Sequence, residues 1–187
     1  PDQAYAHAVA ARERAGRVGA VREAAGIAAY CSGRYTEARA ELRAARRITG
    51  DQSVLPLLAD CERGLGHPER ALEVATSQQA RSLDPAGRAE LLIVASGARR
   101  DMGQADAAVA LLGAAGLRPE SRKPWSARLF YAYADALLEC GRADEARAWF
   151  GHADAADQAG ETDAADRLAE LDGVTVVDTE DTPATDD

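Results

Sequence analysis

The chain has 187 residues and a formal net charge of −9, and aromatic residues make up only 5% of it. No apolar run approaches the roughly 20 residues that a membrane-spanning helix needs, and no signal-peptide pattern is present, so the sequence predicts a cytoplasmic protein. Its three cysteines lie far apart and form no C-x-x-C pair, which argues against a disulfide framework and a zinc site.

The negative charge is concentrated at the C-terminal end. Residues 1–50 hold nine arginines and five acidic residues, a balance of +4, whereas residues 154–187 hold twelve acidic residues and one arginine, a balance of −11. Between them the chain is close to neutral and has no Lys/Arg stripe interleaved with aromatic residues. Nucleic acid is therefore not the expected partner, because neutralisation of phosphates dominates such binding.

A glycine followed five residues later by an alanine occurs four times along the chain. The pairs are Gly33 and Ala38, Gly66 and Ala71, Gly103 and Ala108, and Gly141 and Ala146. Successive alanines lie 33, 37 and 38 residues apart, a period typical of helical repeats. Each glycine falls between two helical patterns, and an acidic residue follows it in the first turn of the next helix, where it complements the helix dipole.

These turns and the apolar periodicity predict ten helices, in chain order at 2–15, 18–32, 35–48, 52–64, 68–80, 86–101, 105–115, 125–139, 143–157 and 161–171. The predicted organisation is an orphan second helix of a truncated preceding repeat (1–17), four helix pairs (18–158), a capping helix (159–172) and an acidic disordered tail (173–187). Pro1 is not a natural start, so the orphan helix is expected to expose Tyr5 and Val9. The cap is expected to present one apolar stripe of Ala164, Ala165, Leu168 and Leu171.

The repeated units resemble the tetratricopeptide pattern W-x₂-L-G-x₂-Y followed by A-x₃-F, which spans 34 residues. The residues that carry the resemblance are small where helices touch: Ala25, Gly26, Ala29, Gly33, Ala38 and Ala45; Ala59, Gly66, Ala71 and Ala75; Ala95, Ser96, Gly103 and Ala108; Ala134, Gly141, Ala146 and Ala153. The chain is similar to a degenerate tetratricopeptide repeat protein over residues 2–171. No unit has the family's tryptophan, and Glu62 stands where a tyrosine is usual. The arginine-rich, alanine-rich composition is typical of a GC-rich bacterial genome of actinobacterial type.

The resemblance implies an all-α fold, a right-handed α-solenoid of antiparallel helix pairs, and a non-catalytic protein–protein interaction module. It also implies that the first helices of successive pairs line a concave groove, which would hold Glu23, Ile27, Tyr30, Asp60, Arg63, Glu90, Ile93, Arg100, Arg128, Tyr131 and Asp135. We expect Tyr30, Arg63, Arg100, Arg128 and Tyr131 to bind the partner. Arginine forks match carboxylates, so an acidic peptide or a C-terminal carboxylate is the expected partner chemistry. In the alternative interpretation, these are solvated side chains balanced by Glu23, Asp60, Glu90 and Asp135.

No motif of catalysis, metal binding or cofactor binding is present. The three histidines, His7, His67 and His152, have no metal-ligand spacing, and neither a G-x-S-x-G turn nor a phosphate-binding loop occurs. Trp125 and Trp149 are interpreted as packing anchors, and the three cysteines as core residues. The sequence therefore predicts a scaffold or adaptor without a cofactor. An alternative is a sensor or oligomerisation domain of a transcriptional regulator, whose DNA-binding half would lie outside this chain.

Overall fold

The computed structural model describes residues 1–173, which form helices and no strand. The helices are α1 (Asp2–Ala15), α2 (Gly19–Cys31), α3 (Tyr35–Thr49), α4 (Leu55–Gly64), α5 (Pro68–Thr76), α6 (Pro85–Asp101), α7 (Ala105–Gly113), α8 (Ser126–Glu139), α9 (Ala143–Ala156) and α10 (Ala164–Leu171), with a short 3₁₀ helix, η1 (Gln79–Ser82), before α6. The predicted all-α class is confirmed. Of the predicted tail 173–187, all but the first residue lies outside the described residues.

The four repeated glycines make the turns between paired helices. Gly33, Gly66, Gly103 and Gly141 have φ between 69° and 76°, in the left-handed region. A side chain with a Cβ is strained in this region, which explains why glycine occupies each turn. The following helix begins two residues later in every case.

The four repeated alanines lie where paired helices touch. Ala38, Ala71, Ala108 and Ala146 are each 0% exposed. Gly26 serves the same purpose on α2, because a Cβ built on it would lie 2.7 Å from Cγ of Leu42 on α3. Small residues at these points let the helix axes approach closely.

Replacing Ala71 or Ala108 by leucine is expected to lower the free energy of unfolding by about 1–3 kcal/mol, because the larger side chain overpacks a closed contact. Urea denaturation followed by circular dichroism measures the change. The control is Ala110→Leu on α7, where the alanine is exposed and the expected change is below about 0.5 kcal/mol. Wild-type stability in both buried variants would contradict this packing.

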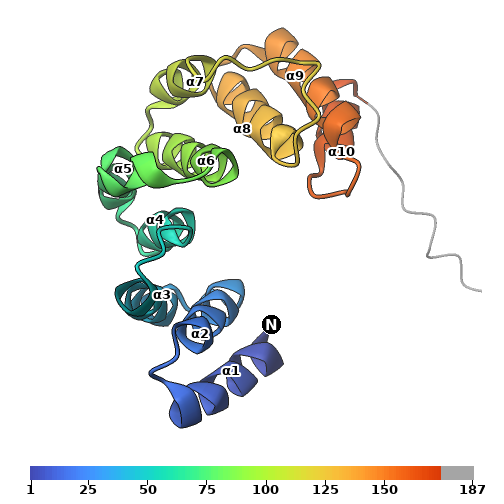
Figure 1. Cartoon of the computed structure of the whole chain (residues 1–187). Helices are drawn as coiled ribbons and strands as arrows, with labels where there is room; N and C mark the ends of the chain where they lie inside the picture. Colours follow the sequence, from blue (N-terminus) through green and yellow to red (C-terminus); the bar gives the residue numbers. More distant parts are fainter. Residues whose placement is uncertain (174–187) are drawn as a thin grey trace, which may run out of the picture.

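The helices are arranged in a curved row, in which each helix packs against the next one in sequence. In addition, α2, α4, α6 and α8 contact one another in order. Figure 1 shows these four helices on the inner side of the curve, with α3, α5, α7 and α9 on the outer side. No helix among residues 1–173 is long and apolar enough to cross a bilayer.

Three helix ends differ from the predicted ones by three residues or more, and a side chain bonds the backbone at each of them. Asp51 accepts hydrogen bonds from the backbone and the hydroxyl of Ser53, and α4 begins only at Leu55. Asp157 accepts hydrogen bonds from the backbone N–H groups of Glu161 and Thr162, which delays α10 to Ala164. After α5, Ser77 is extended and η1 follows, so this helix ends at Thr76.

Several side chains lie elsewhere than predicted. Only Cys61 is a core residue among the three cysteines, and burial raises the pKa of its thiol to about 12; Cys31 is exposed. Ala165 is also exposed, although Ala164 is buried and Leu168 packs against the core. Tyr5 and Val9 are only partly exposed. The ring of Tyr5 packs against buried core residues, and the guanidinium group of Arg34 lies 4.8 Å from its centre.

Buried carboxylates join consecutive helices in the N-terminal half. Glu62, at the position where the resemblance leads one to expect a tyrosine, is 2% exposed and accepts hydrogen bonds from Arg39 (3.0 Å) and Arg43 (2.9 Å) of α3. Glu41 on α3 likewise accepts hydrogen bonds from Arg12 and Arg22. Burial opposes the charge of Glu41, but the two arginines outweigh it and lower the pKa of this carboxyl group.

Candidate functional site

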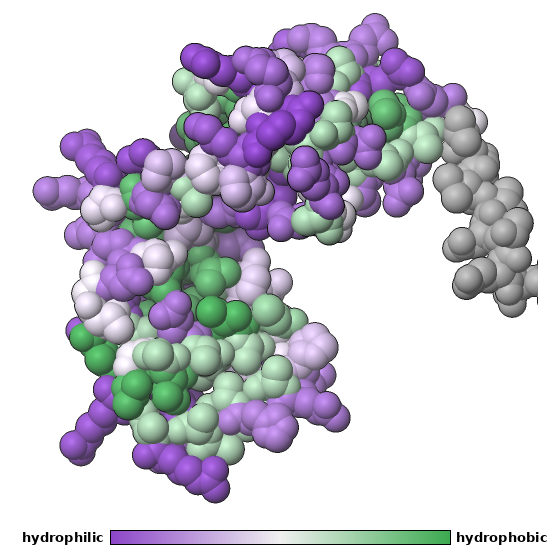
Figure 2. Space-filling view, turned by 45° about the vertical axis from the view of Figure 1, so that its right-hand side comes forward, coloured by the Kyte–Doolittle hydropathy of each residue, from purple (hydrophilic) through white to green (hydrophobic). Residues whose placement is uncertain are grey.

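Four of the five predicted binding residues line one hollow on the inner side of the curve. Arg63 of α4, Arg100 of α6, and Arg128 and Tyr131 of α8 surround a volume of about 500 Å³, which we call the inner groove. The other residues lining it are Ile93, Ser96, Gly97, Ala132, Asp135, Glu161, Thr162 and Asp163. Figure 2 shows the inner side as a hollow between the two arms of the curve, with mostly hydrophilic residues over its upper arm.

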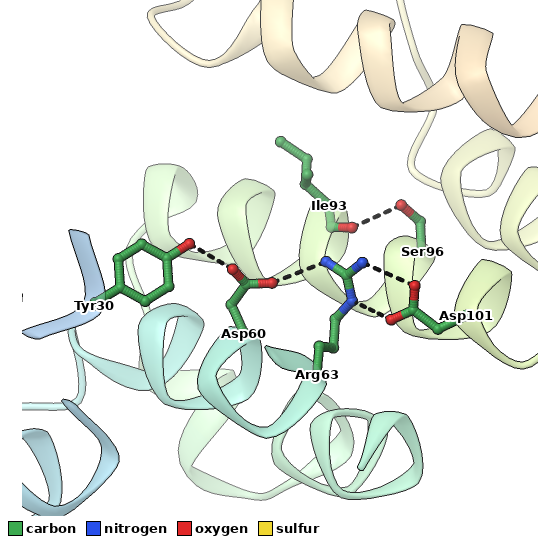
Figure 3. A network of polar contacts seen from close by, with 6 residues as sticks. All are labelled: Tyr30, Asp60, Arg63, Ile93, Ser96 and Asp101. Carbon is green, nitrogen blue, oxygen red and sulfur yellow. Dashed lines mark hydrogen bonds and ion pairs between the residues drawn. The ribbon is translucent and has the colours of Figure 1, made fainter. Parts of the chain in front are cut away.

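Tyr30, the fifth predicted residue, does not line the groove but is linked to it through Asp60. Its hydroxyl donates a hydrogen bond to Asp60, which in turn accepts one from Arg63 at 2.9 Å (Figure 3). Burial, reinforced by the nearby charge of Asp60, raises the pKa of Tyr30. Tyr30 therefore acts as a hydrogen-bond donor that orients Asp60.

Arg63 is held between two helices by carboxylates of this chain. Besides its bond to Asp60 on α4, it binds Asp101 on α6 through Nε (2.7 Å) and Nη2 (3.1 Å), a two-pronged pair. The guanidinium group lies directly over Gly97, where a Cβ would come within 2.5 Å of the Cζ atom of Arg63. The lack of a side chain at Gly97 leaves room for Arg63 to reach from α4 to Asp101 on α6. Figure 3 shows Arg63 between Asp60 and Asp101.

Arg100 and Arg128 are paired in the same way. Arg100 binds Asp135 at 3.1 Å and Glu139 at 2.6 Å, both on α8. Its Nε atom is buried and has no hydrogen-bond partner among residues 1–173.

Arg128 binds Glu90 of α6 at 2.6 Å and Glu161, which precedes α10, at 3.2 Å. Arg63 and Arg100, which the sequence analysis expects to clamp a partner's carboxylate, are thus each paired with two carboxylates of this chain.

The charged residues that line the groove are three arginines and three acidic residues, and a surplus of negative charge arises when their ion-pair partners are included. Each of the three arginines is shared by two carboxylates, so six carboxylates face three guanidinium groups. Arg167 reaches Asp135 at 3.5 Å and Asp163 lines the hollow, which adds one charge of each sign. The lining residues and their ion-pair partners together thus have a surplus of three negative charges.

The carboxyl group of Glu90 has a raised pKa, and burial is the largest cause. The charge of Arg128 opposes that effect, and the like charge of Glu161 adds to it.

Tyr131 is fixed from behind by the core. Its ring lies edge-on to Phe150, with ring centres 5.3 Å apart, and burial together with the neighbouring carboxylate of Asp163 raises its pKa. Trp149 packs against Phe130 at 5.3 Å, and both tryptophans contact the C-terminal core cluster, as their interpretation as packing anchors requires.

Three of the arginine partners were not predicted: Asp101, Glu139 and Glu161. The repeat spacing contained a signal for the first two, because Asp101 follows Arg63 by 38 residues and Glu139 follows Arg100 by 39, close to the repeat period. A residue one period later lies on the next inner helix. Glu161 had no such signal, since its place depends on how the connection between α9 and α10 folds.

The histidines do not lie together. His152 stacks edge-on against Trp149, and His67 lies beside Glu69 in a turn. Within residues 1–173, no three His, Cys, Asp or Glu side chains form a group that could hold a metal ion. The sequence matches no protein-family model and no curated protein.

Proposed function

We propose that the chain is a non-catalytic protein–protein interaction module, a cytoplasmic scaffold or adaptor that binds a peptide or a partner helix in the inner groove. The proposal includes the finer architecture, a right-handed α-solenoid of tetratricopeptide type with α2, α4, α6 and α8 as the first helices of their pairs. One observation carries it: Arg63, Arg100, Arg128 and Tyr131 come from three helices yet line a single hollow. A concave site with an apolar floor and a few convergent polar groups is typical of binding sites.

The charge of the groove favours a partner segment with lysine or arginine side chains. An acidic segment would meet the surplus of carboxylates, and complementary potentials are what select partners and steer association. The three groove arginines act as positioning residues, because each holds two carboxylates in place along the groove. We therefore propose a cationic partner segment for this groove, whereas the sequence analysis expects an acidic one.

The floor of the groove accepts an apolar side chain. Ile93 of α6 and Ala132 of α8 lie between the ion pairs, and Tyr131 stands beside them. The proposed binding segment therefore places an apolar residue on Ile93 and directs its cationic residues toward the carboxylates on either side.

Ile93→Arg tests the proposal, since the long charged side chain would fill the groove and repel a cationic segment. Affinity capture from a lysate of the source cells, quantified by mass spectrometry, is expected to retain partners with the wild type and to lose them with this variant. Ile48→Arg is the matched control, because Ile48 is 49% exposed on the outer helix α3. It should capture the same partners as the wild type.

Circular dichroism must show that both variants are folded. A folded Ile93→Arg variant that captures the same proteins as Ile48→Arg would contradict binding in the inner groove.

A further inference from the structure

A second groove lies between α5 and α7, with α6 as its floor, and we call it the outer groove. Its volume is about 530 Å³, and it is lined by Leu72, Ala75, Thr76, Ser77, Ala80, Arg81, Arg88, Leu91, Leu92, Ala95, Arg99 and Leu111. Two sets of α6 residues recur at helical spacing. The outer groove is lined by residues 88, 91, 92, 95 and 99, and the inner groove by residues 93, 96, 97 and 100. At about 100° per residue, the two sets lie on different faces of α6.

The outer groove exists because neighbouring helices differ in length. α6 has 17 residues, whereas α5 and α7 have nine each. Two short helices cannot cover the full length of the long one. Apolar side chains such as Leu72, Leu92 and Leu111 are consequently left half-buried at the groove instead of fully enclosed.

The charged side chains that line this groove are all arginines: Arg81, Arg88 and Arg99. Arg99 donates a hydrogen bond to Gln104, at 2.7 Å. Arg81 and Arg88 are exposed, and neither has an ion-pair partner within residues 1–173. Asp84, which lies between these two in sequence, accepts a hydrogen bond from Gly87 as the N-cap of α6. This contrasts with the inner groove, where every lining arginine is held by two carboxylates.

We infer that the outer groove docks an acidic amphipathic helix of a partner protein. The apolar face of that helix covers Leu72, Leu92 and Leu111, and its flanking carboxylates reach Arg81 and Arg88. An apolar floor bordered by cations is complementary to such a helix in both hydrophobicity and charge. Because the two grooves lie on different faces of α6 and share no lining residue, the chain can hold a cationic segment and an acidic helix at the same time.

The experiment measures fluorescence anisotropy of synthetic peptides titrated with the full chain at physiological salt. The probe is an amphipathic helical peptide with a leucine face flanked by glutamates. One control peptide has lysines in place of the glutamates, and another has the probe's composition in scrambled order. Only the unscrambled acidic peptide is expected to bind.

The deciding variant is Arg81→Glu with Arg88→Glu, which reverses two exposed charges without touching a core residue. The acidic peptide should bind it at least about tenfold more weakly, which is the size expected for two lost pairs plus repulsion. The matched control is Arg46→Glu with Arg47→Glu on α3. Together with Arg43 these two arginines line a different hollow, which has no apolar residue in its lining. That variant should bind the peptide like the wild type.

Four results would overturn the inference: no binding of the acidic peptide, equal binding of the scrambled peptide, no weakening in the Arg81 and Arg88 variant, or equal weakening in the control variant. The last would mean that binding depends on net charge alone. None of these results bears on the inner groove, whose test uses Ile93.

Discussion

Replacing Arg39 and Arg43 together by alanine is expected to lower the free energy of unfolding by about 3 kcal/mol, because it leaves a buried carboxylate without its cations. Glu62 is only 2% exposed, and these two arginines of α3 donate hydrogen bonds to it. Breaking a buried ion pair usually lowers the free energy of unfolding by about 3–5 kcal/mol. We expect a value at the lower end of this range, because the side chain of Arg43 is 54% exposed and water screens its part of the interaction. Urea denaturation measures the change.

The cause can be isolated with a third substitution. Adding Glu62→Leu to the double variant removes the stranded charge, and stability should return most of the way to that of the wild type, because well-packed apolar residues replace buried ion pairs at little cost. Arg46→Ala with Arg47→Ala, on the same helix, is the control and should change stability by less than about 0.5 kcal/mol. If the Arg39 and Arg43 variant unfolded at the same urea concentration as this control, the carboxylate would not need its partners.

Phe150→Ala is expected to lower the free energy of unfolding by about 3–5 kcal/mol, as large-to-small substitutions of buried aromatic residues do. Phe150 of α9 is 0% exposed in the C-terminal core cluster. Tyr131 packs edge-on against it, and the guanidinium group of Arg167 lies 5.4 Å from its ring centre. The variant should therefore also loosen one wall of the inner groove.

Thermal and urea unfolding measure the loss of stability, and the fluorescence of Tyr131 and its neighbours reports the change at the groove wall. Phe150→Leu keeps most of the volume and should cost clearly less than the alanine variant. Equal stability of the wild type and Phe150→Ala would mean that α9 does not close the core behind Tyr131.

The fold could be predicted from the sequence because its determinants are local. A left-handed turn needs glycine whatever surrounds it, and a closed contact between paired helices needs a small residue one turn later. Gly33 with Ala38 and Gly103 with Ala108 satisfy both requirements within a few residues of chain, and the structure places the glycines at positive φ and the alanines at 0% exposure. For the same reason, the predicted helices deviate mainly at ends such as Leu55 and Ala164, where side chains of Asp51 and Asp157 bond the backbone.

The binding residues could be located only in part. Their helical register placed Arg63, Arg100, Arg128 and Tyr131 on the inner side, and all four line the inner groove. Whether an arginine is free depends on which carboxylates lie within reach, and for Arg63 the partner Asp101 lies on another helix. Neither the composition nor the helical register of the sequence gives the distance between Arg63 and Asp101.

The sequence by itself thus determined the helix pairs, their turns and the face on which the candidate site lies, since those follow from backbone conformation and side-chain size over short spans. Only the tertiary structure decided the charge that each groove presents. Packing between helices pairs Arg100 with Asp135 but leaves Arg81 and Arg88 without a carboxylate within residues 1–173. It also leaves α6 partly uncovered between two shorter helices. These are relations between residues far apart in the chain, which no local pattern records.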